Sequence, residues 1–195
     1  MISLEITGPV REHMGLLGAI PIRTDRLLIR EFQLGDAAEL FSLHRDARAT
    51  RYAGGTRTQE ESLQSLYRII NRVRQTGFGA FALELSSDNE LIGWAGVQKM
   101  IDSERYEIIY ALKASHWGRG LATEAGRALL DAAFALQYLP EIFALVFPQN
   151  IASIRVLEKL GFSFLTYYFD EITQRHACLY RLSEDEFRNS RAVTG

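Results

Sequence analysis

The sequence contains a single cysteine, Cys178, and only four histidines, which lie far apart along the chain. One cysteine excludes an intrachain disulfide, and scattered histidines do not supply the clustered ligands that a zinc site requires. No metal is therefore expected. The chain also lacks a run of about 18 apolar residues, so no membrane-spanning helix is expected.

A strong excess of charge is missing as well. The 22 Lys and Arg residues nearly balance the 24 Asp and Glu residues, which leaves a formal net charge of -2. Such a chain has no general attraction for nucleic acid or an anionic membrane, so neither partner is expected and any anion must be bound locally. The N-terminus lacks the residue order of a signal peptide, and a cytoplasmic location is expected.

Long irregular or repetitive stretches are also few. The 195 residues, 47% hydrophobic and 24% charged, fit one soluble globular domain. Residues 1–20 are the exception, because Gly8, Pro9, Gly15 and Gly18 interrupt their apolar stretches. We expect this segment to be an irregular N-terminal extension.

Regular periodicity begins near Asp25. Strand-like runs cover residues 26–32, 78–85, 91–100, 106–112, 142–147, 163–169 and 176–181. Helical spacing covers residues 37–46, 59–75, 121–136 and 151–160. Antiparallel strands followed by a strand–helix–strand crossover predict an α/β domain of the α+β kind, with a mixed, mostly antiparallel sheet of about seven strands and about four helices.

Several residues mark where these elements begin and end. Thr58 and Glu61 form a capping box, and Gly77 is expected to end the helix that follows it. Asp36 is expected to be the N-cap of the helix over residues 37–46, and residues 183–186 to form a capped terminal turn.

The best candidate for a ligand site is the Gly-Arg-Gly turn at residues 118–120, between a strand and the helix that starts near Leu121. Two glycines let the backbone bend sharply and approach a ligand closely. The helix N-terminus directs free amides and its positive dipole end into the same space, which suits a diphosphate without a metal. Thr123 can add a hydroxyl and Arg119 a charge. Taken alone, however, Gly-x-Gly is also a plain strand-to-helix turn.

Two other phosphate-binding patterns do not match this turn. The dinucleotide fingerprint requires a glycine three residues after Gly120, where this chain has Thr123. The Walker pattern requires Gly-Lys-Ser or Gly-Lys-Thr, which the turn lacks. Strand order also disfavours a Rossmann-type nucleotide-binding domain.

The run YALKASHWGRGLATEAGRALLDAAF, followed by FPQNIASIRVLEKLGF, resembles the GNAT superfamily of N-acetyltransferases. Within it, the sequence is similar to the branch of ribosomal-protein N-terminal (alanine/serine) acetyltransferases, whose first strand and helix look like TDRLLIREFQLGDAAELFSLHRD. The resemblance covers residues 21–184, which leaves residues 1–20 as the extension and residues 185–195 as a C-terminal tail.

This resemblance implies acetyl-CoA as the acetyl donor. Its pantetheine arm would lie where the fourth strand, residues 106–112, splays from the fifth, residues 142–147, and would pair with backbone groups of that fourth strand as a neighbouring strand does. Asn150 contacts the cofactor in the family and can also cap the next helix, and both roles remain open. The implied cofactor-binding residues are Tyr110, Ala111, Leu112, Gly118, Arg119, Gly120, Leu121, Ala122, Thr123, Asn150 and Ser153.

Acyl transfer to an amine needs a group that removes a proton from the amine and one that protonates the leaving thiolate. Many superfamily members use a tyrosine as the acid, at the position of Leu157 here, and leucine cannot donate. Ser153, one turn earlier, is the acid candidate because the ribosomal-protein branch resembles this chain in having a serine there. A serine that serves only the helix N-terminus is the alternative.

Glu107 is the candidate base. It shares a strand face with Ile109 and Ala111, where an apolar environment would suit proton relay. Glu107 could instead bind the acceptor amine electrostatically or be an ordinary exposed glutamate. The branch usually has a glycine and a large aromatic residue where this chain has Ile109 and Ala111, a departure that concerns the acceptor pocket.

We therefore expect an enzyme that transfers an acetyl group from acetyl-CoA to a primary amine, on a protein N-terminus or a small molecule, by direct attack in a ternary complex. The alternative is a non-catalytic acyl-CoA-binding or sensing module, as the absence of a tyrosine at Leu157 would allow. A monomer or homodimer is expected. Among other residues, we expect His44 on a polar helix face, Cys178 in the core, and residues 167–169 near the acceptor pocket.

Overall fold

The computed structural model describes residues 15–101, 103–136, 139–170 and 175–192. Residues 1–14 of the expected extension and 193–195 of the expected tail lie outside this part. The described strands form one eight-stranded sheet in the order β1-β2-β3-β4-β5-β6-β8-β7. They are β1 (Ile22–Arg23), β2 (Leu27–Arg30), β3 (Gly79–Leu85), β4 (Leu91–Lys99), β5 (Tyr106–Leu112), β6 (Glu141–Val146), β7 (Ser163–Asp170) and β8 (Arg175–Ser183).

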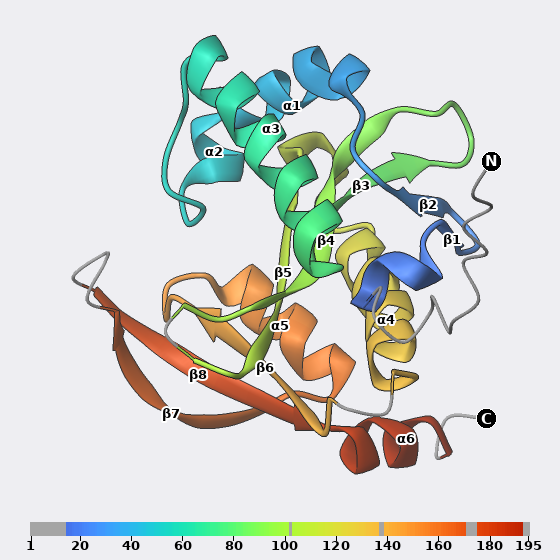
Figure 1. Cartoon of the computed structure of the whole chain (residues 1–195). Coiled ribbons are helices and arrows are strands. Elements are labelled where there is room, and N and C mark those ends of the chain that lie inside the picture. Colours follow the sequence, from blue (N-terminus) through green and yellow to red (C-terminus); the bar gives the residue numbers. More distant parts are fainter. Residues whose placement is uncertain (1–14, 102, 137–138, 171–174, 193–195) are drawn as a thin grey trace, which may run out of the picture.

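Helices cover the sheet (Figure 1). The described α-helices are α1 (Ala37–His44), α2 (Ala47–Thr50), α3 (Gln59–Thr76), α4 (Leu121–Phe134), α5 (Ile151–Leu160) and α6 (Glu184–Ala192). Short 3-10 helices are η1 (Gly15–Ala19), η2 (Leu34–Asp36) and η3 (Ala114–His116). The predicted α+β domain is confirmed, and the described residues add one strand and two α-helices to the expected numbers.

Two apolar clusters pack against the sheet. The smaller joins α1 and α3 to the strands and contains Phe32, Leu40, Leu66, Ala82 and Leu91. The larger contains the buried faces of α4 and α5. These two helices pack closely, because a Cβ at Gly126 would lie 2.7 Å from Cδ1 of Leu160. Helices α1 and α3 therefore pack on the sheet through the smaller cluster, and α4 and α5 pack on it through the larger one.

The sheet splays between β5 and β6, as the resemblance to the GNAT superfamily implies. These strands run parallel, and the register over the described residues pairs only Glu107 with Phe143. On its other side, β5 pairs antiparallel with β4 along its whole length, from Tyr106 to Leu112. Beyond the single pair the two parallel strands separate, so a gap opens toward their carboxyl ends.

Local predictions of helix ends are largely confirmed. Thr58 and Glu61 form the capping box at the start of α3, and Gly77 ends that helix with a left-handed φ of 75°. Asp36 precedes α1, but its side chain makes no cap hydrogen bond. It is the last residue of η2, and its carboxylate accepts instead from the backbone N of Gln33 and from Arg30.

Residues near both ends of the described chain, in η1 and α6, also pack into the core. In η1, the side chain of Leu16 is fully buried, and the backbone N of Leu17 donates to the carbonyl of Gly77. In α6, Phe187 is buried and its ring lies 5.4 Å from that of Phe134. Residues from 15 onward therefore contribute to the core.

Candidate active site

The loop between β5 and α4 has the geometry of an anion site. Gly118 and Gly120 have φ values of 73° and 77°, which glycine adopts without strain. Gly120 is also the N-cap residue of α4, so no side chain there caps the first turn. The first amides of a helix have no intrahelical partner, and their positive dipole end attracts an anion. A Cβ at Gly118 would meet nothing within 4 Å, so the loop is open to a ligand.

Thr24 and Arg26, which lie near β2, hold this loop and the first turn of α4 in place through hydrogen bonds and an ion pair. Arg26 donates from Nη1 to the carbonyl of Arg119 at 2.9 Å and forms a 2.6 Å ion pair with Glu124, in the first turn of α4. Thr24 also donates to the Glu124 carboxylate at 2.6 Å. Burial acts to raise the pKa of Glu124, but the hydrogen bonds from Thr24 and Arg26 outweigh it and lower that pKa. Sequence reasoning missed Arg26, because no local motif marks it.

On the other side of the loop, Arg119 lies 3.1 Å from Nδ1 of His116. Arginine can only donate, so Nδ1 of His116 accepts, and Nε2 of the same ring lies 3.3 Å from Glu90. The indole of Trp117 donates to the carbonyl of Leu112 at 2.9 Å, although half of this side chain is exposed. Trp117 therefore attaches the loop to the end of β5, and Arg119 attaches it to His116.

Glu107 lies on the face of β5 opposite to that of Tyr110, because successive strand residues alternate. Gln98, its partner across the β4–β5 ladder, donates from Nε2 to Oε1 of Glu107 at 3.0 Å. Arg72 of α3 in turn donates to Oε1 of Gln98 at 3.0 Å. The amide of Gln98 is thus oriented by Arg72 so that its NH2 group faces the carboxylate.

Ile109 and Ala111 lie on the same face as Glu107. Ile109 pairs across the ladder with Gly96, and Ala111 pairs with Trp94. A large aromatic side chain, that of Trp94, therefore lies on the neighbouring strand opposite Ala111. The Nε1 of Trp94 is buried and has no hydrogen-bond partner among the described residues.

The other face of β5 carries Tyr110, which is joined to α5. Its hydroxyl lies 2.8 Å from Oγ of Ser153 and 3.2 Å from the Ser153 carbonyl. Asn150 caps α5 by accepting from the backbone N of Ser153, so its predicted capping role is confirmed. Leu157 is buried in the core. The structure thus brings together Tyr110, Asn150 and Ser153, three of the predicted site residues.

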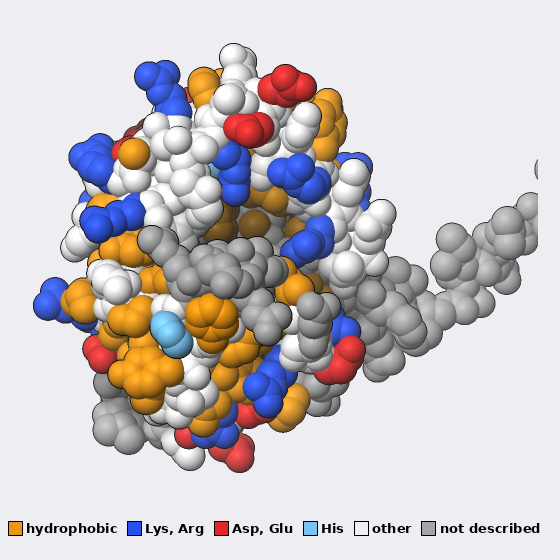
Figure 2. Space-filling view, turned by 90° about the vertical axis from the view of Figure 1, so that its left-hand side faces the viewer, with side chains coloured by type: hydrophobic (Ala, Val, Ile, Leu, Met, Phe, Trp, Pro, Cys, Tyr) orange, Lys and Arg blue, Asp and Glu red, His pale blue; other side chains and the backbone are white. Residues whose placement is uncertain are grey.

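A loop after α2 contacts the segment between β6 and α5. The hydroxyl of Tyr52 donates to the carbonyl of Gln149 at 3.2 Å, and the ring of Tyr52 lies 6.1 Å from that of Phe147. Figure 2 views the molecule from this side and shows a hollow, with Lys and Arg side chains around its upper part and hydrophobic side chains below. The predicted acceptor-side residues Tyr167, Tyr168 and Phe169 are exposed on β7, the edge strand.

The expectation that His44 lies on an exposed polar face is wrong. Its side chain is only 2% exposed, because α3 packs against this face of α1 and Ser62 lies 2.9 Å from Nδ1. Arg57 lies 2.6 Å from Nε2 and must donate, so the ring proton is on Nδ1. Burial, with the charge of Arg57, lowers the pKa of His44 to about 4. The ring is neutral at pH 7 and holds the loop before α3 in place.

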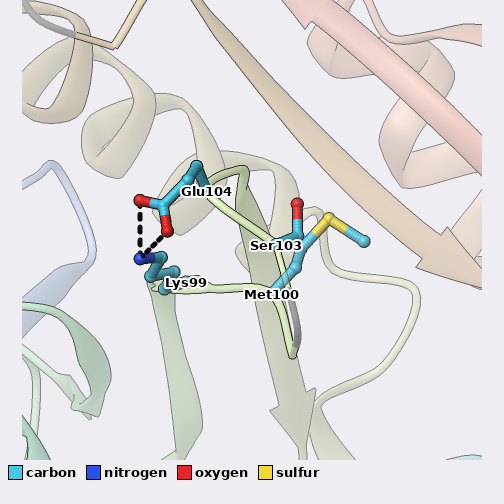
Figure 3. A pocket seen from close by; sticks show the side chains of 4 residues that line it. All are labelled: Lys99, Met100, Ser103 and Glu104. Carbon is cyan, nitrogen blue, oxygen red and sulfur yellow. Dashed lines mark hydrogen bonds and ion pairs between the residues drawn. The ribbon is translucent and has the colours of Figure 1, made fainter.

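A second hollow, of about 400 Å³, lies at the turn between β4 and β5 (Figure 3). It is lined by Lys99, Met100, Ser103 and Glu104. The two charged groups bind each other at 2.7 Å, and the Glu104 side chain is almost fully exposed. This hollow is separate from the gap and the glycine loop.

Metal ligands and membrane spans are both missing from the described part of the chain. Its residues include no group of three or more His, Cys, Asp or Glu side chains placed to hold a metal ion. Its helices include none that is long and apolar enough to cross a membrane. Cys178 is buried and free, as predicted for a core residue.

Residues 26–163 match the family described as acetyltransferase (GNAT) domain. An uncharacterized N-acetyltransferase, p20, of Bacillus licheniformis is 36% identical over 143 residues, which cover 71% of this chain and 80% of that protein. A GNAT-family acetyltransferase from Bacillus anthracis has a TM-score of 0.74 at 26% identity, covering 84% of this chain and 98% of that one. The fold is also similar to that of AAC(6')-Ib in complex with ribostamycin and coenzyme A, with a TM-score of 0.71 at 20% identity, covering 86% and 98% of the two chains.

Proposed function

We propose that this chain, which belongs to the GNAT acetyltransferase family, acetylates a primary amine by direct attack in a ternary complex. Its relatives include proteins that are named N-acetyltransferases. Its dependence on acetyl-CoA is a property of the family, whereas the acceptor and the roles of individual residues are the proposal. The observation that carries it is the glycine loop at the N-terminus of α4, beside the gap between β5 and β6.

The geometry of this region suits acetyl-CoA. The free amides of Leu121, Ala122 and Thr123, with the backbone of residues 118–120, would hold the pyrophosphate. The backbone of residues 110–112 would hold the pantetheine arm, because the register between β5 and β6 includes only the pair at Glu107 and does not reach these residues. Arg119 and the exposed side of Arg26 add positive charge. The cofactor's reactive end would then lie near Tyr110, Asn150 and Ser153.

Arg26→Ala should weaken acetyl-CoA binding by about tenfold and leave kcat nearly unchanged, because the variant loses a charge-assisted hydrogen bond to the loop. It also leaves the Glu124 carboxylate without its cation beside the phosphates. Titration calorimetry with acetyl-CoA measures the affinity, and Arg23→Ala, on the neighbouring strand β1, is the matched control. Equal affinities for the two variants would show that Arg26 does not support the loop.

The candidate proton carriers approach the gap from different sides. Glu107 would take a proton from the protonated acceptor amine, which leaves a neutral nitrogen to attack the acetyl carbonyl carbon. Ser153 would donate a proton to the sulfur as the carbon–sulfur bond breaks. Both are side chains of rigid elements, one on β5 and one in the first turn of α5. No covalent enzyme intermediate is required.

The acceptor would enter through the hollow beneath the loop after α2. Its basic and hydrophobic rims suit a group that presents both polar and apolar surface (Figure 2). A protein N-terminus and a small-molecule amine both remain within the proposal.

A thiol-release assay tests the proposed reaction. Free CoA should appear only when acetyl-CoA and an amine are both present, because direct transfer does not deacylate the donor on its own. Peptides with different N-terminal residues and small amines form the panel, and mass spectrometry of the acceptor confirms N-acetylation. Tight acetyl-CoA binding without turnover across that panel would contradict the proposal and support the non-catalytic binding module instead.

A further inference from the structure

Tyr110 is a second hydroxyl beside the candidate acid, contributed by a different element. It comes from the middle of β5, whereas Ser153 lies 43 residues later in the first turn of α5. The two side-chain oxygens are 2.8 Å apart, an ideal separation for a hydroxyl–hydroxyl hydrogen bond. Tyr110 packs against the core that α4 and α5 share, and both side chains are partly buried. In a relay, Ser153 would be the hydroxyl that faces the ligand and Tyr110 the one behind it.

The geometry points to a two-residue proton relay. We propose that Tyr110 positions the hydroxyl of Ser153 and passes its own proton to Oγ as Ser153 protonates the departing sulfur. This inference rests on the proposed function and on the role proposed there for Ser153. It makes Tyr110 a positioning residue, since it acts through Ser153.

The direction of the hydrogen bond determines whether Ser153 can act on the sulfur. Tyr110 has one proton, and its two acceptors are Oγ of Ser153 at 2.8 Å and the Ser153 carbonyl at 3.2 Å. Donation along the shorter contact occupies a lone pair of Oγ and leaves the serine proton free to point into the gap. Donation to the carbonyl would instead turn the serine proton toward Tyr110, away from the sulfur.

The protons balance over one turnover. The C–N bond forms as the C–S bond breaks, and the electron pair of the latter goes to sulfur. Sulfur takes the proton of Ser153, Oγ takes that of Tyr110, and the phenolate is reprotonated by water. The two protons that the protonated amine loses leave through Glu107 to water, so the protein returns to its starting state.

The relay makes the protonation of the leaving thiolate less unfavourable. A serine that gave up its proton alone would be left as an alkoxide, a much stronger base than the thiolate it protonates. With Tyr110 behind it, the negative charge comes to rest on a phenolate, which is delocalised. Burial raises the pKa of Tyr110 to about 12, although the hydrogen bond to Ser153 acts to lower it, so the hydroxyl is protonated throughout the working pH range.

Three variants test the relay: Tyr110→Phe, Ser153→Ala and the double variant. Single-turnover rates of thiol release, with enzyme in excess over acetyl-CoA, report the transfer step itself. Tyr110→Phe should slow this step by about tenfold, less than the roughly 100-fold or more typical of a general acid because Tyr110 acts through Ser153, with the KM for acetyl-CoA within about twofold. Tyr106→Phe is the matched control, because Tyr106 lies on the same face of β5 but packs on Phe78.

The double variant distinguishes a relay from a structural role. If Tyr110 acts through Ser153, the double variant should be no slower than Ser153→Ala alone, whereas independent effects would multiply. Multiplying losses, or a Tyr110→Phe rate equal to that of Tyr106→Phe, would overturn the relay. An unimpaired Ser153→Ala would overturn it together with the role of Ser153. In each case the proposed function is tested separately, by whether the wild-type enzyme releases thiol only when both substrates are present.

Discussion

Gly120→Val is expected to weaken acetyl-CoA binding by about 100- to 1,000-fold, the loss that corresponds to two or three hydrogen bonds from charged or dipolar groups to a phosphate. The backbone of Gly120 has a φ of 77°, which a β-branched residue rarely adopts. A Cβ at this position would also lie 3.6 Å from Nη2 of Arg26, so the branched side chain would stand between that guanidinium and the amides of α4. Both effects act where the pyrophosphate would bind.

Strain alone must be separated from this loss of binding. Gly77 ends α3 with φ and ψ of 75° and -1°, close to the 77° and 3° of Gly120, and lies outside the glycine loop. Gly77→Val therefore imposes the same left-handed strain, roughly 1–2 kcal/mol, without touching the cofactor site. Calorimetric titration and thermal unfolding of both variants should show similar stability losses and very different affinities. Wild-type affinity in Gly120→Val would refute the role of the loop.

The elements that could be predicted from the sequence are those with local causes. The capping box of Thr58 and Glu61, the left-handed Gly77 and the cap at Asn150 each depend on residues within about one helical turn. Gly118 and Gly120 of the glycine loop could be predicted for the same reason. Asp36 shows the limit even at short range, because its carboxylate had several possible partners and Arg30 was the stronger one.

Features that depend on distant segments could not be predicted. Arg26 and Glu124 are 98 residues apart, and nothing near either of them indicates the ion pair. His44 was expected on a polar face, but α3 packs against it and Ser62 lies within hydrogen-bond distance of its ring. Tyr110 and Ser153 were each singled out, yet their contact across 43 residues depends on how α5 packs on β5. Spacing along one chain does not report such packing.

The candidate base was identified from its strand position, and the structure adds how it is held. Gln98 donates to Glu107 and is itself oriented by Arg72, so the carboxylate has a fixed direction on the face of β5 that α3 covers. Such orientation by a neighbouring amide is what a positioned proton acceptor requires. A neutral amide in place of the Glu107 carboxylate would keep the shape of the side chain but could not take a proton.

Glu107→Gln should lower kcat about 100-fold near pH 7, in line with the usual contribution of a general base. A peptide α-amine has a pKa of about 7.7–8.0, so it is mostly protonated at pH 6.5 and mostly neutral at pH 9.5. The ratio of wild-type kcat to variant kcat should therefore fall as pH rises, while the affinity for acetyl-CoA stays unchanged. Steady-state rates across this range measure it, and Glu104→Gln, on the exposed turn of the same hairpin, is the control. A deficit that is constant with pH would indicate that Glu107 binds the acceptor and does not remove its proton.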